Sequence, residues 1–430
     1  MNTLLVFSPV FVSRIFILVF MALVSALPAA EAANPPAWKV GTASVVITPE
    51  KKLWMAGYAF RNKPAEGKDQ DLFAKALAFE DEQGTRLVLV TADLSAISRA
   101  LRTGVEQKVK AAHGLPREAL LLNASHTHSG PMVRAASARP EVQRDTAEYA
   151  AALEDKVVRI IGEALKNLAP ANVTWNQARA GFAMNRRLPT PKGFVNEPNP
   201  DGPVDHQVPV LRVESPDGQL RAALFGYACH NTTMRGYVWG GDYAGYAQQY
   251  LQEHRKDFTA HFLMGCGGDQ NPYPRMTGDT PMMTEIDNAR SHGRTLANAV
   301  EVALRVPRRP ITGPLLLAYE SVQLDYADGR PPADYPVQVI KFGSSFTLVA
   351  LASEAVVDYS LRLKRELAGD TAVWVAAYCN DILGYIPSQR VLREGGYEAT
   401  AGWAESVEEK IITKVHQLHR QLQPPAPKNP

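Results

Sequence analysis

Residues 123–131 read Asn-Ala-Ser-His-Thr-His-Ser-Gly-Pro and follow directly on an apolar run at residues 119–122. The apolar run predicts a buried strand, and the polar residues after it predict a turn at the end of that strand. Because side chains alternate along an extended chain, His126 and His128 are expected on one face. Paired imidazoles at a strand end are typical of a metal or acid–base site, although a lone His-x-His pattern fits two structural histidines equally well.

The rest of the chain alternates strand-like and helix-like segments, which predicts an α/β fold without internal repeats. The strand-like runs are residues 87–90, 119–122, 208–213, 222–228, 337–342 and 347–352, and the amphipathic helices are residues 147–168, 243–254, 284–304, 356–367 and 404–422. The turn Ser215-Pro216-Asp217-Gly218 joins two of these runs, so at least part of the sheet is expected to be antiparallel. Loops as long as those predicted at residues 186–203, 265–283 and 380–402 are usually functional or disordered.

Composition argues against a nucleic-acid-binding protein and against an electrostatic membrane anchor. The 46 Lys and Arg residues of this 430-residue chain nearly balance the charge of its 44 Asp and Glu residues. At the N-terminus, Arg14, the apolar run 15–27 and Ala30-Glu31-Ala32 predict a signal peptide over residues 1–33, with an uncleaved anchor as the alternative. We therefore expect a secreted or periplasmic protein with one domain over residues 34–423 and a tail at residues 424–430.

The chain has three cysteines, Cys229, Cys266 and Cys379. An odd number cannot form a complete disulfide framework in an exported protein. We expect small buried residues that pack near the site, with a disulfide or a thiol nucleophile as the less favoured alternatives.

The motif at residues 125–131 resembles the hallmark of the neutral/alkaline non-lysosomal ceramidase family, zinc amidases that cleave N-acylsphingosines. Further matching segments follow in the order of the family: Asn185-Arg186, Ala228-Cys229-His230, residues 241–246, Gly268-Asp269, Ser353-Glu354-Ala355, Cys379-Asn380, Tyr385 and Tyr397-Glu398. The resemblance covers about residues 38–420. It implies an α/β sandwich of packed mixed β-sheets, flanked by helices, in a single large catalytic domain.

The resemblance also implies a set of metal ligands: His126, His230, Glu354 and the hydroxyl of Tyr385. Zinc accepts nitrogen and oxygen ligands, and a catalytic zinc site keeps one position open for water. Two imidazoles and a carboxylate also suit non-haem iron, so the choice of Zn²⁺ comes from the family. Taken singly, His230 also fits a core histidine, and Glu354 fits a carboxylate at a helix N-terminus.

Three further residues have roles implied by the family or by their chemistry. His128 is expected to transfer a proton or to hydrogen-bond the substrate, because imidazole titrates near neutral pH. Arg186 and Tyr397 match family positions near the substrate, where they would stabilise charge or orient the polar head. If the assignment to the family position is shifted by one residue, Arg187 takes the place of Arg186. Both arginines would also fit a pair of solvent-exposed surface residues.

Two aspartates follow glycines in matched segments. Asp242 precedes a predicted helix and is expected to cap it. The glycines before Asp269 are expected to let the backbone approach the substrate or metal closely.

The chain departs from the family at two places. The motif alignment puts Gly265 where the family carries a serine, which favours attack by metal-activated water. Longer relatives continue into an immunoglobulin-like domain beyond the position of Leu422. The expected function is a zinc-dependent amidohydrolase acting on ceramide or a related N-acyl lipid. The alternatives are a hydrolase of the same fold for another amide or ester, and a non-catalytic binding protein with a metal pocket. We expect a small-molecule or lipid amide as partner, transient contact with a membrane surface, and no nucleic acid or obligate protein partner.

Overall fold

The computed structural model describes residues 37–134, 139–275, 282–369 and 371–423. The predicted signal peptide and the predicted tail at residues 424–430 lie outside the described residues. Within those described segments, no helix combines the length and the apolar character needed to cross a membrane.

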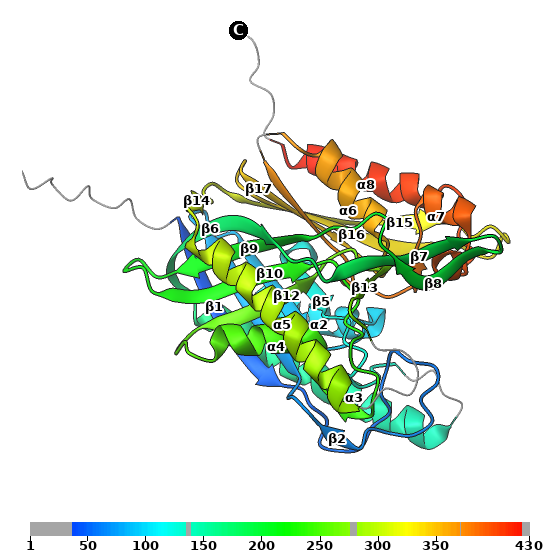
Figure 1. The fold of residues 1–430 in the computed structure, drawn as a ribbon. Coiled ribbons are helices and arrows are strands. Elements are labelled where there is room, and N and C mark those ends of the chain that lie inside the picture. Colours follow the sequence, from blue (N-terminus) through cyan, green and yellow to red (C-terminus); the bar gives the residue numbers. More distant parts are fainter. Residues whose placement is uncertain (1–36, 135–138, 276–281, 370, 424–430) are drawn as a thin grey trace, which may run out of the picture. The chain divides into compact units, whose positions relative to one another are not determined.

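A large mixed sheet forms one half of the described structure (Figure 1). Its strand order is β12-β10-β9-β6-β1-β3-β4-β5, with the short β14 paired to β6. Neighbours are antiparallel except for the β10–β12 and β4–β5 pairs, which are parallel. The strands are β1 (Trp38–Val46), β3 (Phe73–Asp81), β4 (Arg86–Ala92), β5 (Leu120–Ala124), β6 (Ala169–Arg179), β9 (Gln207–Glu214), β10 (Leu220–Tyr227), β12 (Thr259–Met264) and β14 (Arg309–Pro310).

A second sheet of four strands packs against the large one. It has the order β15-β16-β17-β19, with β15 (Leu315–Leu324), β16 (Ala333–Phe342), β17 (Phe346–Leu351) and β19 (Ala372–Ala376). Leu77, Leu224 and Leu263 of the large sheet meet Leu348 and Trp374 of the second in a fully apolar interior. Burial of this surface is the main stabilising contribution to the sandwich.

Helices cover the outer faces of both sheets. On the large sheet, α2 (Arg99–His113) and α3 (Pro140–Lys166) pack on one half, and α4 (Asp242–Gln252) and α5 (Met282–Arg305) pack on the other. On the second sheet lie α6 (Val357–Glu366) and α8 (Val407–Gln421) (Figure 1). The predicted α/β sandwich of packed mixed sheets flanked by helices is therefore confirmed.

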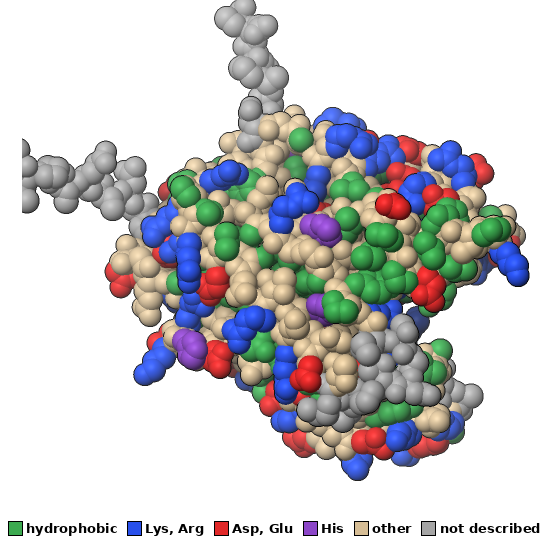
Figure 2. All heavy atoms as spheres, viewed as in Figure 1, with side chains coloured by type: hydrophobic (Ala, Val, Ile, Leu, Met, Phe, Trp, Pro, Cys, Tyr) green, Lys and Arg blue, Asp and Glu red, His purple; other side chains and the backbone are tan. Residues whose placement is uncertain are grey.

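Local sequence accounts for the boundaries of several elements. The side chain of Ser98 accepts a hydrogen bond from the Leu101 amide at the start of α2, and Gly114 ends that helix with φ of 65°. The predicted Ser215–Gly218 turn joins the antiparallel strands β9 and β10. The visible surface carries interspersed acidic and basic side chains, as expected from the near-zero net charge (Figure 2).

All three predicted loops contain short regular elements, and the third, at residues 380–402, includes α7 (Gln389–Glu394). Residues 186–203 contain most of a hairpin of β7 (Ala183–Thr190) and β8 (Gly193–Asn199), and β13 (Gln270–Pro272) pairs with β7 inside the second predicted loop. The β8 residues are mostly exposed, so they lack the apolar alternation by which a strand is recognised. Short pairs elsewhere are β2 (Gly67–Lys68) with β11 (Val238–Trp239), and β18 (Glu354–Ala355) with β20 (Tyr385–Ile386).

The two edges of the large sheet come together. The Met264 amide of β12 donates a hydrogen bond to Asn123 Oδ1 of β5, at 2.9 Å. The Ala377 amide, just after β19, donates to the Met264 carbonyl at 3.0 Å. These contacts bring the ends of strands from both sheets to one region of the molecule.

Candidate metal centre

Three of the predicted ligands, and the predicted catalytic residue His128, lie directly after the ends of long strands. His126 and His128 follow β5, His230 follows β10, and Glu354 follows β17. Bridge pairing of Thr127 with Asn231 holds the two histidine-bearing loops together. Glu354 itself is paired with Tyr385 in the short β18–β20 ladder. Backbone pairing thus joins these four segments in two pairs before any side-chain contact is considered.

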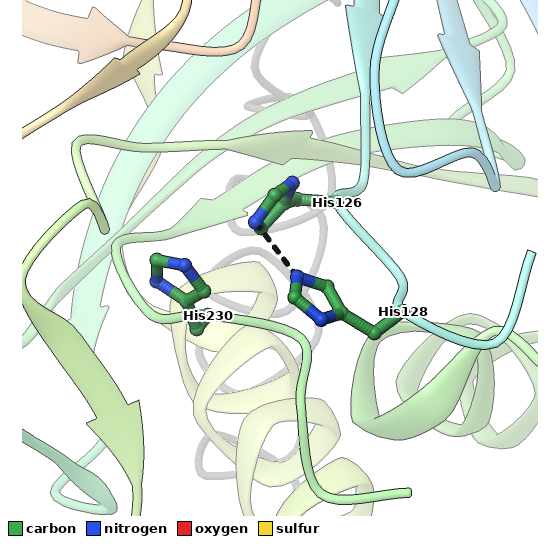
Figure 3. A group of neighbouring side chains, drawn as sticks. All are labelled: His126, His128 and His230. Atoms are coloured by element: carbon green, nitrogen blue, oxygen red, sulfur yellow. Dashed lines mark hydrogen bonds between the residues drawn. The ribbon is translucent and has the colours of Figure 1, made fainter. Parts of the chain in front are cut away.

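The three histidines form one buried group, in which the rings from two loops point toward one another (Figure 3). Their ligand nitrogens all lie within 4.8 Å of one another. The Nε2 atoms of His126 and His128 are 3.1 Å apart, and Glu354 Oε2 is 3.3 Å from Nε2 of both His126 and His230. The Tyr385 hydroxyl is 3.4 Å from His230 Nε2. The structure therefore brings all four predicted ligands and His128 together.

Backbone carbonyls orient two of the imidazoles. His126 Nδ1 lies 2.6 Å from the Ser95 carbonyl, and His230 Nδ1 lies 2.6 Å from the Gly267 carbonyl. A carbonyl only accepts, so both Nδ1 atoms carry hydrogen and each Nε2 lone pair is directed inward. Burial, followed by the charge of Arg186, lowers the pKa of His230 to about 3, so this ring is neutral at neutral pH.

The donor atoms fit a bound cation. Glu354 Oε2 is buried and has no hydrogen-bond partner among the described residues. A carboxylate oxygen that lies 3.3 Å from each of two inward lone pairs is repelled by both unless a positive charge lies among them. A carbonyl that accepts from the second ring nitrogen is also a usual outer partner of a metal-binding imidazole. This group can hold a metal ion.

Backbone around the group is strained. His126, Ser353, Tyr378 and Asn380 all have positive φ, between 57° and 64°. Tyr378 lies against the His126 ring, with ring centroids 4.4 Å apart, and Ser353 directly precedes Glu354. A non-glycine residue in this conformation costs about 1–2 kcal/mol, and such residues concentrate at functional sites.

His128 has a tight pocket of its own. The Tyr58 ring lies at its side, with ring centroids 4.6 Å apart. A Cβ at Gly57 would sit 2.4 Å from His128 Cγ, so position 57 requires glycine. His128 Nδ1 has no hydrogen-bond partner among the described residues, and burial holds the pKa of the ring well below its usual value. The ring therefore has a free nitrogen at neutral pH.

Arg186 and Arg187 are buried and share one carboxylate, so the solvated surface pair is wrong. Arg186 Nε donates to Glu398 Oε1 at 2.8 Å, and an Arg187 nitrogen donates to Glu398 Oε2 at 2.5 Å. Only the first of the two lies over Tyr385 and Tyr397, with its guanidinium carbon 5.3 Å and 5.5 Å from the ring centroids. Arg187 instead contacts the region of Glu394. Of the two arginines, Arg186 is therefore the one that lies at the site.

Tyr397 lies at the outer side of the group. Its side chain is 53% exposed, and its ring packs edge-on against Tyr385 with centroids 5.2 Å apart. Burial alone would lower the pKa of Arg186, but Tyr385 and Glu398 raise it above its ordinary value, so the guanidinium stays charged. A fixed positive charge next to two tyrosines suits a substrate carbonyl or head group.

Glu398→Gln is expected to reduce turnover by about 10–100-fold while metal stays bound, the usual cost of losing an outer partner. The amide keeps the shape but removes the charge that fixes Arg186. We would measure kcat, KM and metal content, with Glu394→Gln, which contacts only Arg187 of the pair, as the control. If Glu398→Gln and Glu394→Gln lost turnover equally, the orienting role of Glu398 would be excluded.

The carboxylates of Asp242 and Asp269 accept hydrogen bonds from backbone amides. Asp269 accepts from the Val357 amide at the start of α6 and from Asn185 Nδ2, at 2.8 Å and 3.0 Å. Asp242 has φ of 52°, and its carboxylate accepts from the Met234 and Tyr243 amides. Asp242 therefore braces the start of α4 as its first helical residue, with Gly241 as the cap.

Gly265 packs closely against Ala228. A Cβ there would lie 3.0 Å from the Ala228 Cβ, in the packed backbone after β12. Asn271 on the same segment is buried and its Oδ1 is 3.4 Å from an Arg186 nitrogen, while its Nδ2 has no partner among the described residues. Sequence reasoning missed Asn271, although it lies two residues after Asp269 in a matched motif.

The described cysteines behave as expected. All three are free and buried. Burial raises the pKa of Cys379 to about 12 and raises those of Cys229 and Cys266 well above the ordinary thiol value. A thiol that stays protonated is a poor nucleophile.

Strand ends that converge on imidazoles, a carboxylate and a phenol are typical of metal-dependent hydrolases as a class. This chain belongs to the neutral/alkaline non-lysosomal ceramidase family, whose N-terminal model matches residues 38–272. The resemblance found in the sequence is thereby confirmed.

Individual relatives support the same assignment. The neutral ceramidase of Pseudomonas aeruginosa is 28% identical over 321 residues, covering 68% of this chain and 47% of the relative. Neutral ceramidase A of Dictyostelium discoideum is 27% identical over 263 residues, covering 55% and 36%. The crystal structure of the Pseudomonas aeruginosa neutral ceramidase matches with a TM-score of 0.76 at 20% identity, over 92% of this chain and 77% of that one. The chain spans about half the length of the curated relatives it matches, or less.

Proposed function

We propose that this protein is a zinc-dependent amidohydrolase that cleaves the amide bond of ceramide or of a related N-acyl lipid. The observation that carries the proposal is the convergence of His126, His230 and Glu354, with two lone pairs and a carboxylate directed at one point. His126, His230, Glu354 and Tyr385 are the residues that would hold the zinc. When bound, zinc supplies Lewis acidity, which lowers the pKa of water to about 7 and makes it a nucleophile.

The chain's own residues supply the remaining roles. His128 lies next to the proposed ligand His126, and it can accept or donate a proton at Nδ1 or Nε2. Arg186 and Tyr397 would orient the substrate carbonyl and stabilise charge that develops on its oxygen. Burial of the three histidines and Arg186 keeps bulk water from these groups and strengthens their interactions.

Export is part of the proposal. Arg14, the apolar run 15–27 and Ala30-Glu31-Ala32 support a cleaved signal peptide and a secreted or periplasmic location. The N-terminal sequence of the mature protein would test this directly.

The central experiment combines metal analysis with hydrolysis of a panel of N-acyl amides and esters. We expect one equivalent of zinc, cleavage of the amides, loss of activity on chelation and recovery when zinc is added back. Stoichiometric zinc with no cleavage of any amide or ester would favour a metal-containing binding protein. Equal activity with iron in place of zinc would contradict the choice of metal.

Cys266→Ala is expected to keep both zinc and full turnover, within about twofold, because a buried thiol with a raised pKa is not the nucleophile. The measurement is steady-state kcat beside intact-protein mass spectrometry after rapid quenching. A covalent acyl adduct on Cys266, or lost turnover with zinc still bound, would contradict attack by activated water.

A further inference from the structure

Two hydrogen-bond donors beside the candidate metal centre are buried and have no acceptor. Arg186 is 3% exposed and Asn271 is 1% exposed. Among the described residues, neither Arg186 Nη2 nor Asn271 Nδ2 has a hydrogen-bond partner. A buried donor without an acceptor has lost the hydrogen bonds that water gave it, which disfavours the folded state. Two such donors on neighbouring side chains therefore point to an acceptor that a ligand supplies.

The direction of the Asn271 amide follows from its contact with Arg186. Asn271 Oδ1 lies 3.4 Å from Arg186 Nη1. A guanidinium can only donate, so the oxygen of the amide faces Arg186 and the nitrogen faces away from it. Arg186 is itself held by Glu398, which accepts from its Nε at 2.8 Å. The two side chains thus hold each other in place and leave one N–H group of each unused.

Backbone pairing places Asn271 next to a proposed metal ligand. Asn271 lies in β13, where it is paired with Met184 of β7 (Figure 1). The His230 amide donates to the carbonyl of Gln270, the residue before Asn271, at 2.9 Å. The side-chain oxygen and nitrogen of Gln270 both form hydrogen bonds within the protein. Asn271 is therefore carried by a fixed strand, which is the support that a positioned donor needs.

We propose that Asn271 is a further catalytic residue, whose Nδ2 donates a hydrogen bond to the carbonyl oxygen of the scissile amide, beside Arg186. The inference rests on the proposed amidase function and adds a group to its site. Arg186 lies over the ring of the proposed ligand Tyr385, so an oxygen held by this pair of donors lies close to the metal centre.

The chemistry of amide cleavage gives this donor its role. When the amide carbon is attacked, negative charge develops on the carbonyl oxygen. Donors that are already in position stabilise this charge more than they stabilise the neutral substrate, so they raise kcat. The Asn271 amide supplies such a donor without adding another buried charge that would need a partner.

Asn271→Leu tests the inference, because leucine keeps the approximate size of the side chain and removes its polar atoms. Zinc should stay bound, kcat should fall by about 100-fold and KM should change by less than about threefold. Asn271→Asp keeps an oxygen that faces Arg186 but lacks the donor, so it should lose turnover as well. Asn176→Leu is the matched control, because Asn176 is buried and its Nδ2 donates to the Pro307 carbonyl. This control should lose stability but keep kcat.

Binding of inert probes gives a readout that does not depend on turnover. The probes are ethyl octylphosphonate, whose anionic tetrahedral phosphorus imitates the attacked amide carbon, and the neutral ketone dodecan-4-one. Calorimetry on the zinc-loaded protein should show that Asn271→Leu weakens binding of the phosphonate by about 10-fold or more and of the ketone by less than about threefold.

The two sets of measurements separate this inference from the proposed function. Amide cleavage by Asn271→Leu at the native rate would overturn the inference while the amidase function stands. A raised KM with native kcat would place Asn271 on another part of the substrate, and full turnover in Asn271→Asp would show that it acts only through Arg186. Unchanged phosphonate binding in Asn271→Leu, or none by the native protein, would also overturn the inference. If no amide is cleaved, weaker phosphonate binding by Asn271→Leu would keep the donor assignment while the amidase function fails.

Discussion

Replacing His230 with alanine is expected to empty the metal centre and abolish amide hydrolysis. Its Nε2 lies 3.3 Å from Glu354 Oε2 and its Nδ1 is fixed by the Gly267 carbonyl, so the alanine variant loses an oriented donor. Loss of an outer partner alone weakens metal binding by about 10–100-fold, and a direct ligand should cost more than about 100-fold. Zinc content after dialysis against buffered zinc is the measurement, with hydrolysis followed in parallel.

His292→Ala is the matched control for that experiment. His292 is also buried, and its ring also contacts a backbone carbonyl, that of Pro274 at 2.9 Å. The control should lose stability but keep its zinc, which separates ligand loss from damage to the fold. A full equivalent of zinc in the His230→Ala protein would remove His230 from the ligand set.

His128→Ala is expected to keep zinc and to lose turnover by roughly 10²–10⁴-fold, the usual contribution of a positioned proton-transfer group. The ring nitrogen lies 3.1 Å from that of His126, and the ion pairs of Glu354 among the described residues are with His126 and His230, not with His128. Its Nδ1 has no partner, so a nitrogen is available for a proton or a substrate. Zinc content and kcat, measured on the same preparation, are the two readouts.

The two readouts distinguish three roles. Loss of zinc in His128→Ala would make this imidazole a ligand, which the close grouping of the three rings also allows. Unchanged turnover with zinc bound would leave it only a packing role against Tyr58. Tyr58→Phe is a useful companion, because it keeps the ring contact and removes only a hydroxyl whose hydrogen bond goes to the Thr232 carbonyl.

Sequence patterns predicted the parts of the fold that have a clear period. The α5 and α8 helices fall within a few residues of the predicted segments, and the apolar runs at β5, β9, β10, β16 and β17 are strands. β1 and β6 were missed because exposed and buried residues alternate irregularly along them. β8 was missed because almost nothing in it is buried. Tertiary pairing, rather than local pattern, makes these segments strands.

The sequence indicated which residues lie at the site, but it did not indicate the contacts that hold those residues in place. Pattern alone placed His126 and His128 on a strand end, while His230, Glu354 and Tyr385 came from the order of family motifs. The supporting contacts join residues far apart in the chain: Ser95 to His126, Tyr58 to His128, and Glu398 to Arg186. No local pattern encodes such contacts, because they depend on which loops the two sheets bring together.

The left-handed residues around the centre have a consequence for how this protein can change. Glycine would relax the backbone at each, yet Ser353 Oγ accepts from the Leu383 amide and Asn380 Oδ1 accepts from the Leu122 amide and Arg102. Tyr378 lies against His126, and His126 is itself a proposed ligand. Relief of strain and retention of the side chain are therefore opposed at every one of these positions. Selection for heat resistance alone therefore gains little from glycine at Ser353 or Asn380, where the lost hydrogen bonds cost about as much as the strain that is relieved, about 1–3 kcal/mol.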